Sequence, residues 1–502
     1  MAAFVVDLQV IFIFILVWLF SAFFLFKKPR KSNVRLPPSP PALPVIGHLH
    51  LLLSIPWFKS FQKLSSKYGP FLHLRLCNTS IVLVSSASVA NEIFKTQDVN
   101  FSDRNHGVTE NSLLFSDSGF LLAPYGAYWK FMKKVAISEL LGRQYLERTR
   151  EIRGEELDRF YVTLLEKAKR GEPFDVVNEM TKLSSNGLSR MLMGRKMSEE
   201  NGEAEQVKDL VVKSFGLMRK LFLAYGLRPL KKIGISFFER EIREVSQKFD
   251  ELLEKILREH EENPNREQKD TMDLLLEAYH DENAQYKISR DQMKSFLADI
   301  LIGGIDSSAR STEWIMAELI NHPNILKKVR DEIESVVGKD RKLRESDVSS
   351  LPYLQAVVKE GLRLHPPGLL VFRKCREWCK IRGFDVPENT PVVINNYGIM
   401  RDPNSWENPD EFRPERFFGS SAEENREQSF KFLVFGGGRR ACPGEKLAYL
   451  SIGAAVGTMA HYFDWKIDGE KVNVEESGGM DLAMAHPLMS VPVVRFTPSA
   501  SV

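Results

Sequence analysis

The sequence predicts a mainly helical protein with small β-sheets, preceded by one N-terminal transmembrane helix. Apolar residues recur at a spacing of three to four through most of the chain, whereas β-like runs are few and short. One long apolar run stands at the N-terminus. With 43% hydrophobic and 27% charged residues, the 502-residue chain can form a large core. Its formal charge of only +3 argues against a nucleic-acid-binding surface.

The N-terminal apolar run, Leu8–Phe26, predicts a membrane-spanning helix. As a helix it is about 28 Å long, which is close to the thickness of the bilayer core. Asp7 precedes the run and a basic flank follows it, so the chain after the run is predicted to stay in the cytosol. A cleavable signal peptide is the alternative, but its basic residues would precede a shorter apolar run. We therefore predict that residues 1–31 form a signal anchor with its basic flank.

The next segment, residues 32–47, is a proline-rich neck that contains Pro37-Pro38-Ser39-Pro40-Pro41. Successive prolines favour an extended, stiff backbone. The segment directly follows the predicted anchor, which favours a spacer over a ligand for a proline-binding domain. The remainder, residues 48–502, shows no clear break and is predicted to be one domain.

Within this domain, periodic apolar residues predict helices, and short β-branched runs predict strands. The helices are expected over Trp57–Tyr68, Ala87–Thr96, Tyr125–Leu140, Tyr145–Arg170, Asn178–Met193, Glu205–Leu223, Phe237–His260, Arg290–Ile320 and Glu445–Tyr462. The strands are expected over Phe71–Leu76, Ile81–Ser85, Pro391–Ile394 and Val491–Phe496. The stretch Asp402–Ser429, rich in Pro, Asn, Glu and Arg, is predicted to be irregular.

The strongest chemical signal is the loop Phe435–Gly444, which carries Cys442 among glycines and arginines. Glycines let a backbone curl around a sulfur atom, and amide N–H groups can stabilise its charge. Arg440 can pair with carboxylates, and the helix that follows favours an anion at its N-terminus. A phosphate-binding loop would end in Gly-Lys-Ser/Thr, and a dinucleotide loop would open a βαβ unit; neither pattern is present. The loop therefore favours a thiolate ligand to haem iron.

This loop resembles the haem-binding signature of the cytochromes P450, FxxGxRxCxG, at Phe435, Gly438, Arg440, Cys442 and Gly444. The resemblance extends over essentially the whole chain and implies the cytochrome P450 fold. It also implies that Glu360 and Arg363, in an ExxR motif, form a buried structural pair joined by Arg416.

A second motif of the family is Gly303–Ser308, inside the predicted helix Arg290–Ile320. Each central glycine costs a helix about 1 kcal/mol relative to Ala. Close helix packing is one explanation, and a local opening for O₂ and water beside the haem is the other. In the second, Asp306 and Ser307 would relay protons. The family usually has Thr at position 307 and often Ala at 303, so this chain departs from its pattern at both.

A third motif implies the residues that hold the haem propionates. Trp129 and Lys133 match a W-x-x-x-R pattern in which Lys replaces Arg, so the charge remains and the planar fork is lost. Arg373 aligns with a further propionate-binding arginine.

The resemblance implies a haem-thiolate monooxygenase with haem b, O₂ and electrons from NADPH through NADPH–cytochrome P450 reductase. It places the chain in the endoplasmic reticulum membrane as a single-pass protein, with the catalytic domain, residues 48–502, facing the cytosol. A basic docking face for the reductase is expected from Lys130, Lys134, Lys431 and Arg439, although ordinary solvated side chains explain these residues equally well.

The chain is most similar to plant microsomal A-type members, and among them to the thalianol and arabidiol oxygenases of triterpene metabolism. By family analogy, substrate contacts are expected from Asn105–Leu122, from Phe215–Leu230, and from Leu369, Leu370, Val371, Phe372 and Met484. These apolar regions suit a small hydrophobic triterpenoid or related terpenoid. A flavonoid or phenylpropanoid hydroxylase is the alternative. A reductase-independent haem-thiolate isomerase or dehydratase and a non-enzymatic haem carrier also stay open.

Overall fold

The computed structural model describes most of the chain after residue 33. The described residues are 16, 18, 34–44, 46–52, 56–77, 79–104, 113–114, 119–194, 202–226, 238–263, 269–283, 286–419, 428–478 and 482–498. The chain divides into a unit of residues 1–36 and a unit of residues 37–502. Apart from Leu16 and Trp18, the predicted membrane span lies outside the described residues. No helix in the described part combines the length and apolar character that a bilayer crossing needs.

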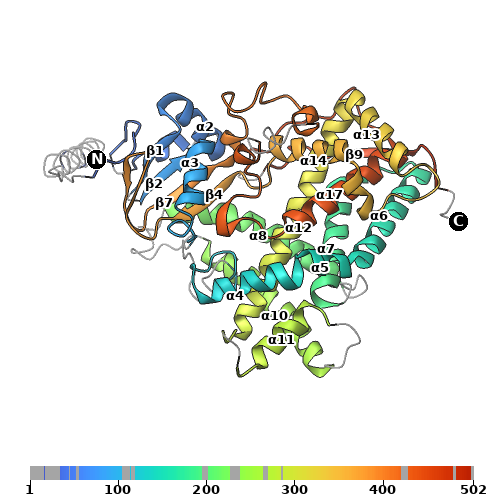
Figure 1. Cartoon of the computed structure of the whole chain (residues 1–502), viewed down its shortest axis with the longest axis horizontal. Coiled ribbons are helices and arrows are strands. Elements are labelled where there is room, and N and C mark those ends of the chain that lie inside the picture. Colours follow the sequence, from blue (N-terminus) through green and yellow to red (C-terminus); the bar gives the residue numbers. More distant parts are fainter. Residues whose placement is uncertain are drawn as a thin grey trace, which may run out of the picture. The chain divides into compact units, whose positions relative to one another are not determined.

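The second unit is mainly helical, as predicted (Figure 1). Its α-helices are α2 (Trp57–Tyr68), α3 (Ala87–Asn91), α4 (Ala127–Val135), α5 (Arg143–Arg148), α6 (Arg150–Arg170), α7 (Val176–Met193), α8 (Glu203–Gly226), α10 (Glu239–Glu262), α11 (Thr271–His280), α12 (Arg290–Asn321), α13 (Pro323–Val336), α14 (Pro352–Leu364), α15 (Asn396–Ile399) and α17 (Glu445–Tyr462). Two π-helical turns, η2 (Glu92–Thr96) and η3 (Ala136–Leu140), continue α3 and α4. Short 3₁₀ turns are η1 (Leu49–Leu52), η4 (Glu345–Ser350), η5 (Pro414–Phe417) and η6 (Gly438–Arg440).

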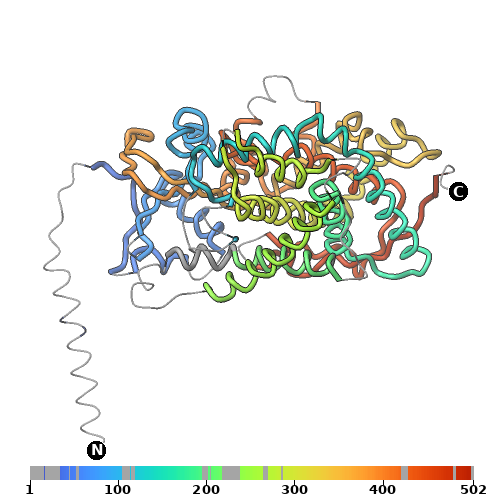
Figure 2. The backbone as a smooth tube through the Cα atoms, turned by 90° about the horizontal axis from the view of Figure 1, so that it is seen from below, coloured from blue at the N-terminus to red at the C-terminus, as the bar shows by residue number. Residues whose placement is uncertain are grey.

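The small sheets predicted from the sequence are also present. The largest has the order β1 (Phe71–Leu76), β2 (Thr79–Val84), β7 (Pro391–Asn395) and β4 (Leu370–Lys374). Only the β2–β7 pair in it is parallel, with Leu83 opposite Val393. A second sheet contains β3 (Phe174–Asp175), β9 (Met489–Val494) and β8 (Phe463–Lys466), and a hairpin contains β5 (Cys379–Ile381) and β6 (Phe384–Val386). Figure 2 shows the red C-terminal segment with β9 running beside the teal helix α6.

The 32-residue helix α12 is the central element of the helical part. It begins at a capping box, in which Ser289 Oγ accepts from Gln292 N at 3.2 Å and Gln292 Oε1 accepts from Ser289 N at 3.0 Å. Most of its side chains are buried because α7, α8, α14 and α17 all pack against it. The helix predicted over Tyr145–Arg170 is instead interrupted at Thr149, whose hydroxyl donates to the Tyr145 carbonyl at 2.8 Å. A side chain that bonds its own backbone competes in this way with a continuous helix.

The described part of the proline-rich neck is hydrogen-bonded to the folded body. Pro38 O accepts from His73 N of β1 at 2.8 Å. Pro40 O lies 2.8 Å from the Nε2 atom of buried His48. These contacts fix where the neck meets the body, whereas its role as a membrane spacer stays a prediction.

Candidate active site

Most of the predicted catalytic, cofactor-binding and substrate residues line one cavity of about 630 Å³ inside the second unit. Helix α12 contributes the Gly303–Ser308 segment to its wall, and β4 with the residues before it contributes Leu369, Leu370, Val371 and Phe372. The loop before α17 contributes Cys442. The cavity wall therefore combines residues that are far apart in the sequence. Arg104 and Cys442, for example, are more than three hundred positions apart and both line it.

The cysteine loop is closed by backbone geometry. Cys442 N donates to the Phe435 carbonyl at 2.9 Å, so the loop returns on itself. Gly438 has a φ of +67°, and a Cβ atom there would lie 2.3 Å from Asp98 Oδ1 and 2.6 Å from the Phe94 carbonyl oxygen. A residue with a side chain would therefore be both strained and obstructed at this position. Gly444 ends the loop as the N-cap of α17.

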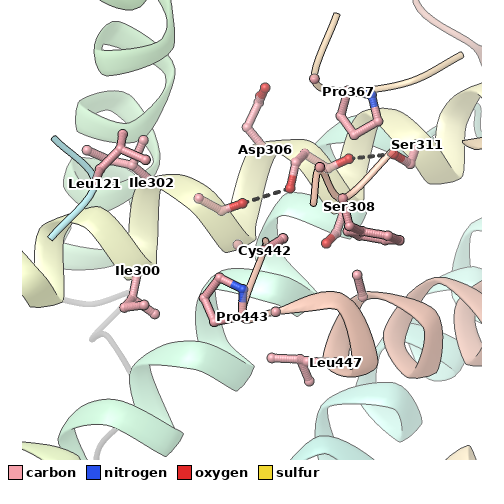
Figure 3. A pocket seen from close by; sticks show the side chains of 18 of the residues that line it. Leu121, Ile300, Ile302, Asp306, Ser308, Ser311, Pro367, Cys442, Pro443 and Leu447 are labelled. Carbon is pink, nitrogen blue, oxygen red and sulfur yellow. Dashed lines mark hydrogen bonds between the residues drawn. The ribbon is translucent and has the colours of Figure 1, made fainter. Parts of the chain in front are cut away.

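The Cys442 sulfur is enclosed by protein, yet part of its surface is open because it faces the cavity (Figure 3). Burial is the main influence and raises the pKa of the Cys442 thiol. The backbone N–H of Gly444 and the charges of Lys133 and Arg104 act in the opposite direction on this pKa. The loop therefore supplies the N–H group, and Lys133 and Arg104 supply the positive charge, that favour a thiolate.

Four cations cluster on this side of the cavity. Arg104, Lys133 and Arg440 line it, and Arg373 is buried close to Arg104 and Arg440. Burial lowers the pKa of each, that of Lys133 to about 8 and that of Arg440 to about 9. Neighbouring positive charges lower the pKa of Lys133, Arg373 and Arg440 further. Arg373 is buried, and its Nη2 atom has no hydrogen-bond partner within the described residues. The cluster therefore has more positive charge than the nearby acids balance, and it offers a free donor to an anion.

Contacts within the protein hold these cations in place. Arg440 donates from Nε to Ser102 O at 2.6 Å, and its guanidinium lies 4.2 Å from the centre of the Trp129 ring. Lys133 Nζ donates to Ala441 O at 2.9 Å, and Arg104 Nη2 donates to Arg440 O at 3.1 Å. The structure thus brings the predicted Trp129, Lys133, Arg373 and Arg440 together. It adds Arg104, which sequence reasoning missed because an arginine in an irregular segment carries no periodic signal.

The two glycines of α12 differ in their surroundings. A Cβ atom on Gly303 would meet no atom within 4 Å, whereas one on Gly304 would lie 2.6 Å from Leu188 Cδ1 of α7. Gly304 therefore permits close helix packing, and Gly303 leaves open space. The use of that space by O₂ and water stays a prediction. Ser307 Oγ donates to the Gly303 carbonyl at 2.8 Å.

The Asp306 side chain does not point towards Cys442, as it would have to in order to pass protons there directly. Its Oδ2 atom pairs with Arg310 Nε at 2.7 Å, one turn further along α12. Figure 3 shows its side chain pointing away from Cys442. Of the two predicted residues, Ser307, which is partly open to the cavity, is therefore the better placed.

The glycine pair yields a prediction for stability. Gly303→Ala should gain up to about 1 kcal/mol of helix propensity. Gly304→Ala should gain the same propensity but lose about 1–3 kcal/mol to overpacking of the new methyl group against buried Leu188. Thermal unfolding of the two full-length variants should therefore give the lower midpoint to Gly304→Ala. Equal midpoints would show that the Leu188 side chain or α7 shifts at little cost to make room for the methyl group.

The predicted structural triad is present behind the cavity. Glu360 and Arg363 are fully buried and joined by two hydrogen bonds of 2.7 and 2.9 Å. Arg416 Nε, from η5, lies 3.2 Å from Glu360 Oε1. Arg363 Nη1 also donates to Met400 O at 2.7 Å. These contacts connect α14 to the irregular segment that precedes the cysteine loop.

The predicted substrate residues divide into two groups. Leu369, Leu370, Val371 and Phe372 line the cavity, together with Phe120, Leu121, Leu122 and Phe215. Met484 is buried in the core and does not line this cavity, whereas Leu482 does. Residues 105–112, 115–118 and 227–230 lie outside the described residues.

The predicted docking residues lie on or near the surface. Lys130 and Arg439 are exposed, and both lie over the Tyr125 ring, at 4.9 and 5.8 Å from its centre. Lys134 is exposed on the same helix as Lys130. Lys431 is only partly exposed and donates to Ser405 O at 2.7 Å.

The sequence and the fold of this chain both match those of known proteins. The sequence model of cytochrome P450 matches residues 37–493. The chain is 54% identical to cytochrome P450 705A22 of Arabidopsis thaliana, over 98% of both chains. It is 41% identical to 3,9-dihydroxypterocarpan 6A-monooxygenase of Glycine max, over 98% of this chain and 99% of that one. A zebra fish cytochrome P450 structure with abiraterone matches with a TM-score of 0.73 and 23% identity, over 87% of this chain and 99% of that one.

Proposed function

This chain belongs to the cytochrome P450 family and is a monooxygenase, and we propose that it oxidises a triterpenoid or related terpenoid of plant specialised metabolism. The observation that supports this substrate class is the cavity wall beside Cys442 and Gly303, which is largely aliphatic. Leu121, Ile302 and Leu369 are among the residues that line it. A wall of branched aliphatic side chains suits a fused aliphatic skeleton, and dispersion contacts would hold it without fixed polar partners.

The family implies a haem-iron cofactor, and the residues present fit it. The surplus positive charge of Arg104, Lys133, Arg373 and Arg440, and the free Nη2 of Arg373, match the two propionates of haem b. We propose that these four residues and Trp129 hold the propionate side. Cys442 is proposed to bind the haem iron through its sulfur, within the loop of Phe435, Gly438, Arg440 and Gly444. Once bound, a haem-thiolate supplies cleavage of the O–O bond and insertion of oxygen into C–H bonds.

The chain's own residues position the substrate and supply protons. The open face at Gly303 gives O₂ and water access to the backbone of α12, and Ser307 holds a hydroxyl beside it. We propose that Ser307 passes protons towards the reacting oxygen and that Asp306 exchanges protons with solvent after separating from Arg310. The apolar wall excludes bulk water from the reacting carbon.

Two external components complete the proposal. Electrons come from NADPH through NADPH–cytochrome P450 reductase, which docks on a basic face that includes Lys130 and Arg439. The apolar run Leu8–Phe26 anchors the chain in the endoplasmic reticulum membrane, and residues 48–502 face the cytosol. A flavonoid or phenylpropanoid hydroxylase is the second candidate, supported by the 41% identity to the pterocarpan monooxygenase.

Product profiling tests this proposal. The full chain is co-expressed with a plant reductase and supplied with terpenoid and phenylpropanoid panels under isotopically labelled O₂. We expect a terpenoid product that carries one labelled oxygen atom and depends on NADPH. A labelled product only from the phenylpropanoid panel would support the second candidate. Unlabelled product formed without NADPH would indicate an isomerase or dehydratase.

A further inference from the structure

Asp299, in the first half of α12, is a carboxylate that opens onto the cavity. The residue is surrounded by protein but is not fully buried. Its accessible part faces the cavity, because Asp299 is one of the residues that line it. Leu121 N donates to its Oδ2 atom at 2.8 Å. The Phe120 N–H donates a second hydrogen bond to this carboxylate. A carboxylate can accept about four hydrogen bonds, so acceptor positions remain for a group in the cavity.

Asp299 differs from the other acids of the cavity wall. Within the described residues, Glu156, Glu345 and Asp306 each pair with an arginine, at 2.7, 2.6 and 2.7 Å. No cation in the described part of the chain forms such an ion pair with Asp299. A buried carboxylate without a cation is costly, and burial raises the pKa of Asp299 to about 7. The Leu121 N–H and the charge of Arg104 lower this pKa only in part.

We propose that Asp299 is the polar anchor of the substrate cavity and accepts a hydrogen bond from a hydroxyl group on an otherwise apolar substrate. This inference rests on the proposed function, because it assigns a chemical feature to the same substrate. Asp299 thereby becomes a specificity-determining residue. A buried hydrogen-bonding group discriminates strongly against a ligand that leaves it unpaired.

The anchor also restricts which carbon is oxidised. Asp299, Gly303 and Ser307 are spaced by four residues and therefore lie along one face of α12. The helical rise separates Asp299 from Gly303 by about 6 Å and from Ser307 by about 12 Å along the axis. A substrate held by its hydroxyl at Asp299 would present carbons two to three fused rings away to the Gly303 opening.

A purely structural role for Asp299 is the competing explanation, since it holds the segment 119–123. Phe120 of this segment stacks on Trp129 with ring centres 6.0 Å apart, and its carbonyl accepts from Arg440 Nη1 at 3.5 Å. Asp299→Asn separates the two roles. Its side-chain oxygen can still accept from Leu121 N, while an amide N–H₂, which cannot accept, faces the cavity.

The experiment compares a triterpene alcohol with its methyl ether, which cannot donate a hydrogen bond. Haem-loaded full chain is titrated with each at pH 8, where carboxylate predominates at Asp299, and the dissociation constants are read from the haem absorption shift. Arg104 and Tyr128 are the other ionisable groups near Asp299. We expect wild type to prefer the alcohol by about tenfold or more, because hydrogen bonds to charged groups contribute about 1.5–3 kcal/mol. In Asp299→Asn this preference should fall below about threefold.

Asp291→Asn is the matched control, because Asp291 lies on the same helix with a side chain that is 77% exposed. It should keep the wild-type preference. Equal weakening of both ligands in Asp299→Asn, with the preference intact, would overturn the proposal in favour of a structural role. If wild type binds neither triterpene probe, the terpenoid assignment fails, and a hydroxylated flavonoid with its methyl ether is used. No preference for the hydroxyl form in either class would overturn the Asp299 proposal.

Discussion

Replacing Cys442 with Ala is expected to abolish monooxygenase activity and the thiolate-type absorption of the CO-bound, reduced protein. Of the four cysteines, only Cys442 lines the described cavity. Its loop is already closed by the bond from Cys442 N to Phe435 O at 2.9 Å. Bound iron would keep this sulfur deprotonated despite the burial that raises its pKa. None of the other three cysteines, all of them described, lines this cavity to supply a second thiolate, so product formation should fall to the background level.

Absorption spectra and haem content of the purified full chain check this prediction separately from turnover. Cys77→Ala is the control, because Cys77 is a free, partly exposed cysteine outside the cavity wall. It should retain wild-type spectra and activity. A thiolate-type spectrum that persists in Cys442→Ala would refute the ligand assignment, and an imidazole-type spectrum in wild type would do the same.

The sequence predicted those parts of the fold and site that local patterns determine. Helices α2 and α17 and strand β1 have the predicted bounds, because apolar periodicity and flanking Gly or Pro act within a few residues. The cysteine loop was recognisable for the same reason, since the positive φ of Gly438 and the turn into α17 are local requirements. Fold class and the cysteine loop were therefore accessible without coordinates.

Features created by long-range packing were not accessible in this way. Strand β4 was missed because its residues form a short, half-buried run beside β7, which begins 17 positions after β4 ends. Arg104 reaches the cavity from an irregular segment, and Asp299 is one polar residue in a long helix. Only the packed structure shows that both face the cavity. The direction of Asp306 likewise depends on Arg310, which no motif indicated.

The second large effect is expected from Glu360→Gln, which should destabilise the fold by about 3–5 kcal/mol. Glu360 accepts hydrogen bonds from Arg363 and Arg416 and from Arg413 N at 2.9 Å. The amide would leave two buried guanidinium groups without a negative charge, and removal of one partner from a buried ion pair is far more costly than loss of a surface pair. The whole stability of a domain is typically about 5–15 kcal/mol, so much of the variant should fail to hold haem.

Chemical denaturation of the full chain, followed by fluorescence and haem absorbance, measures this loss. Asp331→Asn is the control, because Lys327–Asp331 is also a cation–carboxylate pair within one helix, at 2.7 Å, but its side chains are 74% and 62% exposed. Such a pair contributes less than about 1 kcal/mol, so the control should unfold close to wild type. The difference between the two variants isolates burial as the cause. The unfolding free energies of Glu360→Gln and Asp331→Asn could instead differ by less than about 1 kcal/mol. The triad would then not be what stabilises the connection between α14 and the segment before the cysteine loop, and haem retention would depend on the cation cluster and Cys442 alone.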